Sequence, residues 1–501
     1  MILTKENLNN ITAPGIQKPG KGIFGLPEKV LQFGTGVLLR GLPDYFIDKA
    51  NRQGIFNGRV VVIKSTDSGD AAAFDQQDGL YTLCIRGIED GKKAEENIIC
   101  SAISRVLSAK AQWREILQCA HNPAMQVIIS NTTEVGIQLV EEMIESGPPA
   151  SFPGKLLAFL LERYTAFEGA ASAGMVIVPT ELITDNGKKL AAIVKELALF
   201  NKLEDAFIAW VETHCRFCNS LVDRIVPGKP DAATLQQLQQ DLGYTDGLLS
   251  ISEVYRLWAI EGDEKVQSVL SFAAADAGVV IRPDIGIFRE LKLRLLNGTH
   301  TLSCGLAYLS GFATVKNAMD DPGFSAFVAD LMLTEIAPAI PYELPYQEAR
   351  DFGLRVLDRF RNPHIQHQWI SITMQYSSKM RMRNVPVLLE HYKKQATPPR
   401  LFSLGFAAYL LFMRPVQQDA AGFRGELRGQ FYPVNDDKAG YYFDLWKGRT
   451  ADEVVAIALK DESLWGADLS VLPGFGDAVR ENLDILIHKG PAAALAMNVK
   501  G

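Results

Sequence analysis

The chain has 501 residues, a length at which two or three domains are expected rather than a single core. Its 58 acidic and 51 basic residues give a net charge of −7 and are spread along the chain, which excludes the basic surface typical of proteins that bind nucleic acid or anionic membranes. We therefore expect small-molecule partners, and a monomer or small homo-oligomer.

The sequence predicts neither a secreted nor a membrane protein. Residues 1–25 are polar and lack the apolar core of a signal peptide, and apolar runs such as 402–413 fall short of the ~20 residues of a membrane helix. A cytoplasmic protein is expected. Of the six cysteines, only Cys215 and Cys218 have metal-ligand spacing, and no second ligand pair accompanies them, so no metal site is expected.

A glycine turn follows the first predicted strand. The strand at residues 29–33 runs into Gly34-Thr35-Gly36, and a helical pattern follows at residues 42–50. Strand, glycine turn and helix open a dinucleotide-binding unit, because the glycines allow a tight turn and a helix N-terminus attracts a pyrophosphate. Leu39 stands where the third glycine of that fingerprint is expected, so a generic strand-to-helix turn is the alternative at this point.

Polar side chains follow three further predicted strands where those strands end. The strands at residues 59–63, 125–130 and 175–179 are continuous apolar runs of the kind buried in parallel sheets. Open α/β sheets bind ligands at the carboxyl ends of their strands, so these side chains are candidates for a cofactor site. They are Asp67 after the first strand, Asn131 and Thr132 after the second, and Glu181 after the third.

Asp67 bears on the choice of cofactor. An acidic residue after the second strand of such folds binds the adenosine ribose and excludes a 2′-phosphate, which favours NAD over NADP. Lys64 nearby has the opposite preference, and Asp67 could instead cap the next segment.

Two other segments border the predicted sheet. Residues 77–83 predict a turn that feeds a strand, and a charged loop is expected around residues 89–96. Further on, Asp223 and Arg224 stand side by side in an apolar frame, either as a structural ion pair or as a wall of the substrate cleft. Asp223 and Glu181 are therefore candidate substrate-binding residues.

Helical periodicity prevails from about residue 288, and the first long helix carries Lys292, Asn297 and His300. At about 100° per residue, Asn297 lies about 140° and His300 about 80° round from Lys292, so all three can border one site. A lysine beside apolar residues has its charged form disfavoured and becomes a candidate general acid or base. The asparagine and a neutral histidine can donate hydrogen bonds to an oxygen that gains negative charge during hydride transfer.

This trio indicates carbonyl or alcohol chemistry without a metal. The alternative is an amphipathic helix whose lysine reaches solvent and whose histidine is a core residue. Farther along, basic residues gather at Lys379, Arg381 and Arg383. Such a run is usually a solvated face, but beside a cleft it could receive a substrate carboxylate, which makes Lys379 a candidate substrate-binding residue.

Over roughly residues 29–490, the chain resembles the long-chain polyol dehydrogenases of the mannitol dehydrogenase family. The resemblance rests on Lys292-x4-Asn297-x2-His300, Gly34-x-Gly36-x3-Arg40, Gln77-Asp-Gly-Leu-Tyr-Thr, Val222-Asp-Arg224 and Lys379. It implies a lysine general acid/base, an oxyanion site made by the asparagine and histidine, and no metal. The expected NAD-binding residues are Phe33, Gly34, Thr35, Gly36, Val37, Leu38, Arg40, Asp67, Asn131 and Thr132.

Within the family the closer likeness is to members that reduce a ketouronate with NADH. Mannitol-type members carry an arginine and a histidine eight and five residues before the lysine that matches Lys379, where this chain has Ser371 and Met374. Their asparagine after the fifth strand has no clean counterpart here, Glu181 being nearest. These departures argue against a neutral polyol. The alternatives are another ketouronate, a polyol, or a non-catalytic dinucleotide-binding sensor.

The expected fold is an α/β Rossmann-like domain with a parallel-rich sheet, followed by a mostly α-helical domain. We place the dinucleotide-binding domain at residues 1–284 and the helical catalytic domain at residues 285–501.

Overall fold

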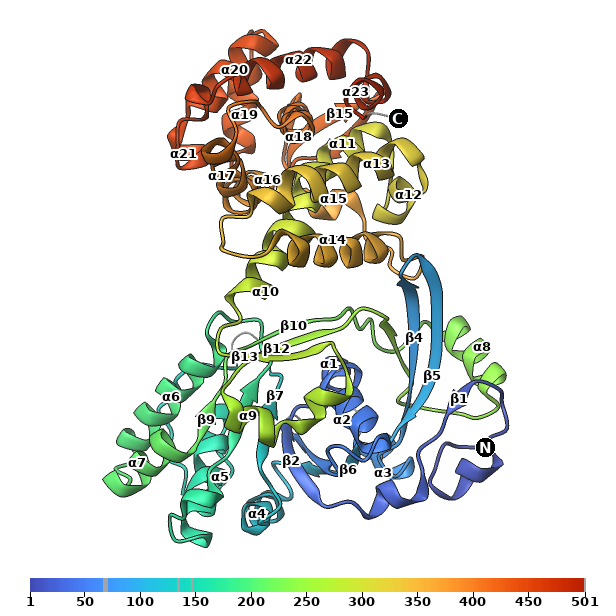
Figure 1. The fold of residues 1–501 in the computed structure, drawn as a ribbon, viewed down its shortest axis with the longest axis vertical. Coiled ribbons are helices and arrows are strands. Elements are labelled where there is room, and N and C mark those ends of the chain that lie inside the picture. The colour runs from blue at the N-terminus through green and yellow to red at the C-terminus, as the bar shows by residue number, and fades with distance from the viewer. Residues whose placement is uncertain (66–70, 133–135, 146, 500–501) are drawn as a thin grey trace. The chain divides into compact units, whose positions relative to one another are not determined.

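A computed structural model describes residues 1–65, 71–132, 136–145 and 147–499. The chain divides into two compact units, and Figure 1 shows their elements. The first unit comprises Met1–Gly87 and Lys93–Ile285, and the second comprises Ile88–Lys92 and Gly286–Gly501. Asp67, one of the expected cofactor-binding residues, lies outside the described residues.

A six-stranded, all-parallel sheet forms the centre of the first unit. Its order is β6-β3-β2-β7-β8-β9, which is the 3-2-1-4-5-6 order of a dinucleotide-binding fold. The strands are β2 (Glu28–Phe33), β3 (Arg59–Lys64), β6 (Ile103–Ser108), β7 (Val127–Ser130), β8 (Val176–Pro179) and β9 (Arg216–Phe217). The predicted Rossmann-like domain with a parallel-rich sheet is confirmed.

Both faces of this sheet are covered, which explains why its inner strands β3, β7 and β8 are almost entirely apolar and buried. The helices of the unit are α1 (Val37–Gly41), α2 (Pro43–Arg52), α3 (Ala71–Gln76), α4 (Trp113–Gln118), α5 (Phe152–Ala166), α6 (Asn186–Phe200), α7 (Asp205–His214), α8 (Ala232–Leu242) and α9 (Glu264–Val269). Val30 and Val62 pack on the side of α2, whereas Leu31 and Ile63 pack on the side of α5, α6 and α7. Helices α5, α6 and α7 lie side by side along one face of the sheet (Figure 1).

Two smaller sheets complete the first unit. One has the order β1-β5-β4-β11 and the other β10-β12-β13. Their strands are β1 (Ile16–Gln17), β4 (Tyr81–Glu89), β5 (Lys92–Cys100), β11 (Ser250–Glu253), β10 (Ser220–Asp223), β12 (Leu257–Glu261) and β13 (Val279–Arg282).

The expectation of a charged loop around residues 89–96 is wrong. These residues lie in the long hairpin of β4 and β5 (Figure 1). Asp90 and Gly91 connect the two strands with φ of 52° and 72°. Positive φ at both central residues is the requirement of a two-residue hairpin turn, and Asp-Gly is a favoured pair for it. The dipeptide was therefore a stronger predictor than the charge of the segment.

The second unit is mostly helical, as predicted. Its α-helices are α10 (Gly286–Leu291), α11 (Thr299–Ser310), α12 (Val315–Asp320), α13 (Pro322–Asp330), α14 (Tyr346–Phe360), α15 (Trp369–Ile372), α16 (Tyr376–Lys379), α17 (Val385–Lys394), α18 (Arg400–Phe412), α19 (Ala439–Trp446), α20 (Ala451–Lys460), α21 (Glu462–Trp465), α22 (Phe475–His488) and α23 (Pro491–Asn498). Three π-helical segments interrupt them, η6 (Lys292–Gly298), η7 (Leu331–Ile336) and η9 (Met380–Asn384). A small antiparallel sheet, β14 (Gln417–Asp419), β15 (Gly422–Leu427) and β16 (Gln430–Pro433), was not expected.

Helix α18 is the central element of this unit because nearly all of its side chains are buried, and it packs against α11 and α22. Two glycines allow α11 and α18 to approach closely. A Cβ at Gly405 would lie 2.7 Å from the carbonyl oxygen of Leu302, and one at Gly305 would lie 3.0 Å from that of Ala408. This crossing fixes α11, the helix that carries His300. In the part of the chain that is described, no helix combines the length and the hydropathy needed to cross a bilayer.

Candidate active site

The glycine turn lies where the strand order of the main sheet reverses, between β2 and β7. Gly34 has φ of +126°, and a Cβ there would lie 2.9 Å from the carbonyl oxygen of Asn131 and 2.9 Å from Cδ1 of Leu39. Only glycine fits such a position without strain. Leu39, which replaces the third glycine of the fingerprint, is thus one of the residues that leave no space for a side chain at Gly34.

A cavity of about 600 Å³ opens beside this turn. Four of the predicted cofactor-binding residues line it, namely Gly34, Thr35, Asn131 and Thr132. The rest of its lining was not predicted from the sequence and consists of Ser65, Gly136, Gln138, Val140, Ala150, Ser151, Phe152 and Lys155. Its position at the strand-order switch is where dinucleotides bind in such sheets.

Helix α5 supplies the residues of that lining that could have been predicted. Ser151 caps the helix by accepting a hydrogen bond from the Gly154 N–H at 2.9 Å, and Pro153 stands in its first turn. Serine before proline at the start of an apolar periodic segment predicts such a helix start. Lys155, one turn farther on, is buried and donates to the carbonyl oxygen of Ala150 at 2.7 Å.

The other predicted cofactor-binding residues lie around the turn. Phe33 is buried, with its ring 5.0 Å from that of Phe152, and Gly36 precedes α1, whose first residues are Val37 and Leu38. Arg40 is not part of the described cavity lining. Its Nη1 donates to the carbonyl oxygen of Leu248 at 2.7 Å, so in this structure its guanidinium anchors another segment.

Glu181 holds the strand-end cluster together. Its carboxylate accepts hydrogen bonds from the Thr132 N–H at 2.8 Å, from Thr132 Oγ1 at 2.9 Å and from Ser130 Oγ at 3.1 Å. With 3% of its surface exposed and three donors bound, this carboxylate positions Thr132. A direct contact of Glu181 with substrate stays a prediction.

Asp223 is buried at the end of β10, and its role in substrate binding likewise stays a prediction. The neighbouring Arg224 has a clearer function. It donates from Nη1 to the carbonyl oxygen of Gly41 at 2.6 Å and from Nε to that of Glu253 at 3.0 Å. Arg224 therefore ties the end of α1, the helix that follows the glycine turn, to β11.

The predicted catalytic residues lie in the second unit, on one continuous helix made of α10, η6 and α11. Lys292 and Asn297 are both half-buried in η6, and the α-helical spacing expected between them does not hold. A π-helix bonds residue i to i+5 and has a wider turn than an α-helix, so side chains five apart lie closer together round the axis than the roughly 140° of an α-helix. Lys292 and Asn297 therefore share a face more closely than the sequence predicted.

The side-chain amide of Asn297 has no protein partner among the described residues, although its backbone oxygen accepts a hydrogen bond from Thr301 Oγ1 at 2.8 Å. His300, in the first turn of α11, is 7% exposed. Its ring stacks on that of Phe360 at 4.0 Å and meets the ring of His367 edge-on at 5.2 Å. Nε2 is buried and has no hydrogen-bond partner among the residues that the structure describes, which costs free energy unless a ligand satisfies it.

Burial lowers the pKa of His300 well below its usual value, and the nearby charges of His367, Arg359 and Arg383 lower it further. The imidazole is therefore neutral near pH 7, with one N–H to donate. This is the form required to stabilise an alkoxide without competing as an acid.

Hydrogen bonds between two π-helical segments keep η6 in place. Arg294 donates from Nη1 to the carbonyl oxygens of Met382 at 2.6 Å and Arg383 at 2.8 Å, both in η9. In the reverse direction, Asn384 Nδ2 donates to the carbonyl oxygen of Gly298 at 3.0 Å. These side chains satisfy carbonyl groups that the wider turn of a π-helix presents differently from an α-helix.

The neutral state of His300 should make the folded protein less stable in acid. The unperturbed pKa is about 6.5 and the folded value is lower, so below about pH 6.5 the unfolded chain binds a proton that the folded chain excludes. This contribution to the free energy of unfolding is level above that pH and falls by up to about 1.4 kcal/mol per pH unit below it. Urea unfolding at one pH above and one below about 6.5 measures the free energy of unfolding. In acid this free energy should fall less for His300→Asn than for the wild type. An equal loss in both proteins would contradict the prediction, and His488→Asn, a surface change, is the control.

Lys379, the remaining predicted substrate-binding residue, ends α16 and is directly followed by η9. Its Nζ donates to the carbonyl oxygen of Ile372 at 3.1 Å. Burial lowers the pKa of Lys379, and the charge of Arg383 lowers it further. His367 also has a lowered pKa, caused by desolvation and by the charge of Lys379. Lys379 thus belongs to the surroundings of His300.

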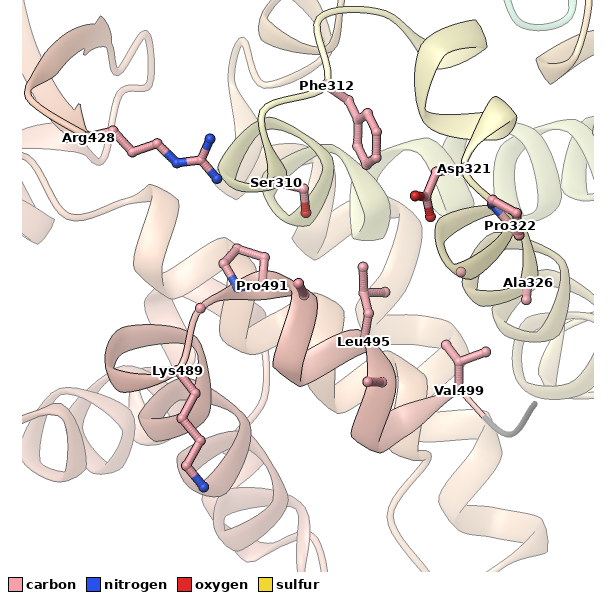
Figure 2. Close-up of a pocket in the computed structure, with 14 residues that line it drawn as sticks. Ser310, Phe312, Asp321, Pro322, Ala326, Arg428, Lys489, Pro491, Leu495 and Val499 are labelled. Carbon is pink, nitrogen blue, oxygen red and sulfur yellow. The ribbon is translucent and has the colours of Figure 1, made fainter.

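Two other features of the chain are separate from this site. A cavity of about 890 Å³ lies in the helical unit, with Leu495 of α23, Val499 directly after that helix, Pro322 of α13 and Phe312 among its walls (Figure 2). It shares no residue with the trio. Cys215 and Cys218 are buried, and burial raises their pKa values to about 11 and about 12, so both are protonated thiols.

Comparison with known families matches residues 28–272 to the mannitol dehydrogenase Rossmann domain and residues 284–487 to the mannitol dehydrogenase C-terminal domain. The chain belongs to the mannitol dehydrogenase family. The predicted family is thereby confirmed. In this family member, the Rossmann domain carries the glycine turn and the C-terminal domain carries Lys292, Asn297 and His300.

Two relatives of this mannitol dehydrogenase family member are altronate oxidoreductases. That of Halalkalibacterium halodurans is 37% identical over 481 residues, which cover 94% of this chain and 93% of the relative. That of Yersinia enterocolitica is 38% identical over 479 residues, covering 94% and 96%. The mannitol 2-dehydrogenase of Pseudomonas fluorescens, solved as a ternary complex with NAD and D-mannitol, shares the fold with a TM-score of 0.63 at 22% identity, covering 99% of each chain.

Proposed function

We propose that this chain is an altronate oxidoreductase, which reduces tagaturonate to altronate with NADH in the breakdown of hexuronates. The reaction is a reversible hydride transfer between a ketone and a secondary alcohol. One structural observation supports the proposal most directly. The buried Nε2 of His300 has no partner within the described part of the chain, and His300 lies on the helix that carries Lys292 and Asn297. The names of relatives 37–38% identical over nearly the whole chain support the choice of substrate.

The residues of the glycine turn fit a dinucleotide. Gly34 leaves no Cβ between β2 and β7, and the first N–H groups of a helix such as α1 have no intrahelical acceptor, so they can donate to a pyrophosphate. Asn131 and Thr132 line the adjoining cavity. Bound NADH would supply the hydride.

The trio would supply the proton and hold the developing charge. Lys292 donates a proton to the ketone oxygen as the carbon is reduced, and takes it back in the oxidation direction. The Asn297 amide and the neutral His300 each donate a hydrogen bond to the same oxygen. An amine and two donors provide every proton and charge function that the oxygen needs, so the proposed reaction is independent of a metal.

An absorbance assay of NADH oxidation tests this function directly. We expect the highest kcat/KM with tagaturonate, and lower values with fructuronate and with the neutral ketoses tagatose and fructose. Faster reduction of fructuronate would make the protein a fructuronate reductase, and faster reduction of fructose would make it a polyol dehydrogenase. Tight NADH binding without oxidation by either ketouronate would indicate a non-catalytic sensor.

A further inference from the structure

Arg383 of η9 lies against the helix that carries the catalytic trio. Its Nη1 donates to the carbonyl oxygen of Asn297 at 3.4 Å and to Thr301 Oγ1 at 3.1 Å. The side chain is half-buried, and these two contacts are its only hydrogen bonds among the described residues. A guanidinium has five N–H donors, so Arg383 keeps donors available for another acceptor beside Asn297.

Arg383 and Lys379 are close enough for the charge of Arg383 to lower the pKa of Lys379. The imidazoles of His300 and His367 lie near these two cations, because Arg383 contributes to the lowered pKa of His300 and Lys379 to that of His367. Within the described residues, neither Arg383 nor Lys379 forms an ion pair. Among the described residues, the carboxylate that acts on Lys379 at longer range is that of Asp436, which already accepts hydrogen bonds from the N–H groups of Ser377 and Lys438.

Like charges held together in a half-buried site repel one another more strongly than in water, and an anionic ligand removes this cost. The ligand proposed above is an anion, and its ketone and carboxylate lie towards opposite ends of the sugar chain. While Lys292 and His300 hold the ketone oxygen, the carboxylate must be held by other groups. A guanidinium matches the two oxygens of a carboxylate better than an ammonium does.

We infer that Arg383, assisted by Lys379 and His367, binds the carboxylate of the substrate and thereby selects a ketouronate over the neutral ketose. This inference rests on the proposed function and names the specificity-determining residue of the same site.

The test compares tagaturonate with tagatose, which differs by having a hydroxymethyl group in place of the carboxylate. For Arg383→Gln we expect KM for tagaturonate to rise about 10- to 100-fold, because one charge-assisted contact is lost, while kcat changes less than about threefold. The kcat/KM for tagatose should stay near the wild-type value. Arg383→Lys keeps the positive charge but lacks the paired N–H groups of a guanidinium. Its KM for tagaturonate should therefore lie between those of the wild type and of Arg383→Gln. Arg381→Gln is the matched control, since Arg381 is exposed on the same segment and its side chain donates to the carbonyl oxygen of Ser463 at 3.3 Å.

The possible results separate the inference from the proposed function. Equal losses with both sugars, or a loss in kcat alone, would show that Arg383 merely braces η6 and would overturn the inference. An unchanged KM for tagaturonate would overturn it as well. In both cases a wild-type protein active on tagaturonate would leave the proposed function standing. A wild-type protein inert with tagaturonate and fructuronate would refute the proposed function, and the carboxylate subsite with it.

Discussion

Replacing Lys292 by alanine should lower kcat for tagaturonate reduction by about 10²- to 10⁴-fold, the range that a general acid contributes. Without the amine, the oxygen that becomes an alkoxide has no proton donor, although Asn297 and His300 can still donate hydrogen bonds to it. The dissociation constant of NADH should stay within about threefold of the wild type, because the glycine turn lies in the other unit. Steady-state kinetics and titration of NADH fluorescence measure the two effects separately.

Two variants sharpen this prediction. Lys292→Arg keeps a positive charge but cannot give up its proton near neutral pH, so it should be about as inactive as the alanine variant. Small primary amines added to Lys292→Ala should restore part of the turnover, whereas they should not help Lys292→Arg, whose side chain fills the space. Turnover of Lys292→Ala that persists across the pH range would refute the assignment of Lys292.

Replacing Gly34 by alanine should raise the dissociation constant of NADH at least about tenfold. The residue has φ of +126°, and its Cβ would lie 2.9 Å from the backbone oxygen of Asn131. Backbone strain in this region costs about 1–3 kcal/mol, and a shift that relieves it displaces the turn that should hold the pyrophosphate. Isothermal titration with NADH measures the effect.

Gly25→Ala is the control for this change, because Gly25 has no atom within 4 Å of its ideal Cβ position and no positive φ. It should bind NADH as the wild type does. A wild-type dissociation constant for Gly34→Ala would contradict the placement of the cofactor at this turn. A lower melting temperature with normal NADH affinity would show that Gly34 matters for folding alone.

The main sheet was predictable because its strands carry the necessary information locally. The apolar runs that form β2, β3, β7 and β8 are buried on both faces, and such runs favour parallel strands. Polar residues at their carboxyl ends then led to Asn131 and Thr132, both in the lining of the cavity. By contrast, Ser151 and Lys155 reach the same cavity from α5, and only the folded chain shows that the start of this helix lies beside the glycine turn.

The π-helical geometry of η6 could not be read from the sequence. Its residues suit an α-helix, and the pattern of apolar side chains does not distinguish the two. The wider turn depends on tertiary hydrogen bonds, such as those of Arg294 and Asn384 with carbonyl groups in η9 and η6, nearly 90 residues apart in the chain. The same distant contacts bring Arg383 to Asn297, so sequence spacing indicated the basic run but not which of its members faces the trio.

Similarly, the role of Glu181 was predicted from its position at a strand end and that of Arg40 from the glycine-turn motif of the family, yet their hydrogen-bond partners were not predicted. Glu181 is held by Ser130 and Thr132, and Arg40 by the carbonyl oxygen of Leu248, which is 208 residues away in the chain. A charged residue near a predicted site can equally serve to support it. Only the partners decide between these roles.

The most direct test of the account is a crystal structure of the protein with NAD and altronate. We predict that Lys292 Nζ, the Asn297 amide nitrogen and His300 Nε2 all lie about 2.6–3.2 Å from the one hydroxyl oxygen whose carbon faces the nicotinamide. A substrate oxygen held by other side chains, with the amine of Lys292 directed into bulk solvent, would contradict the account.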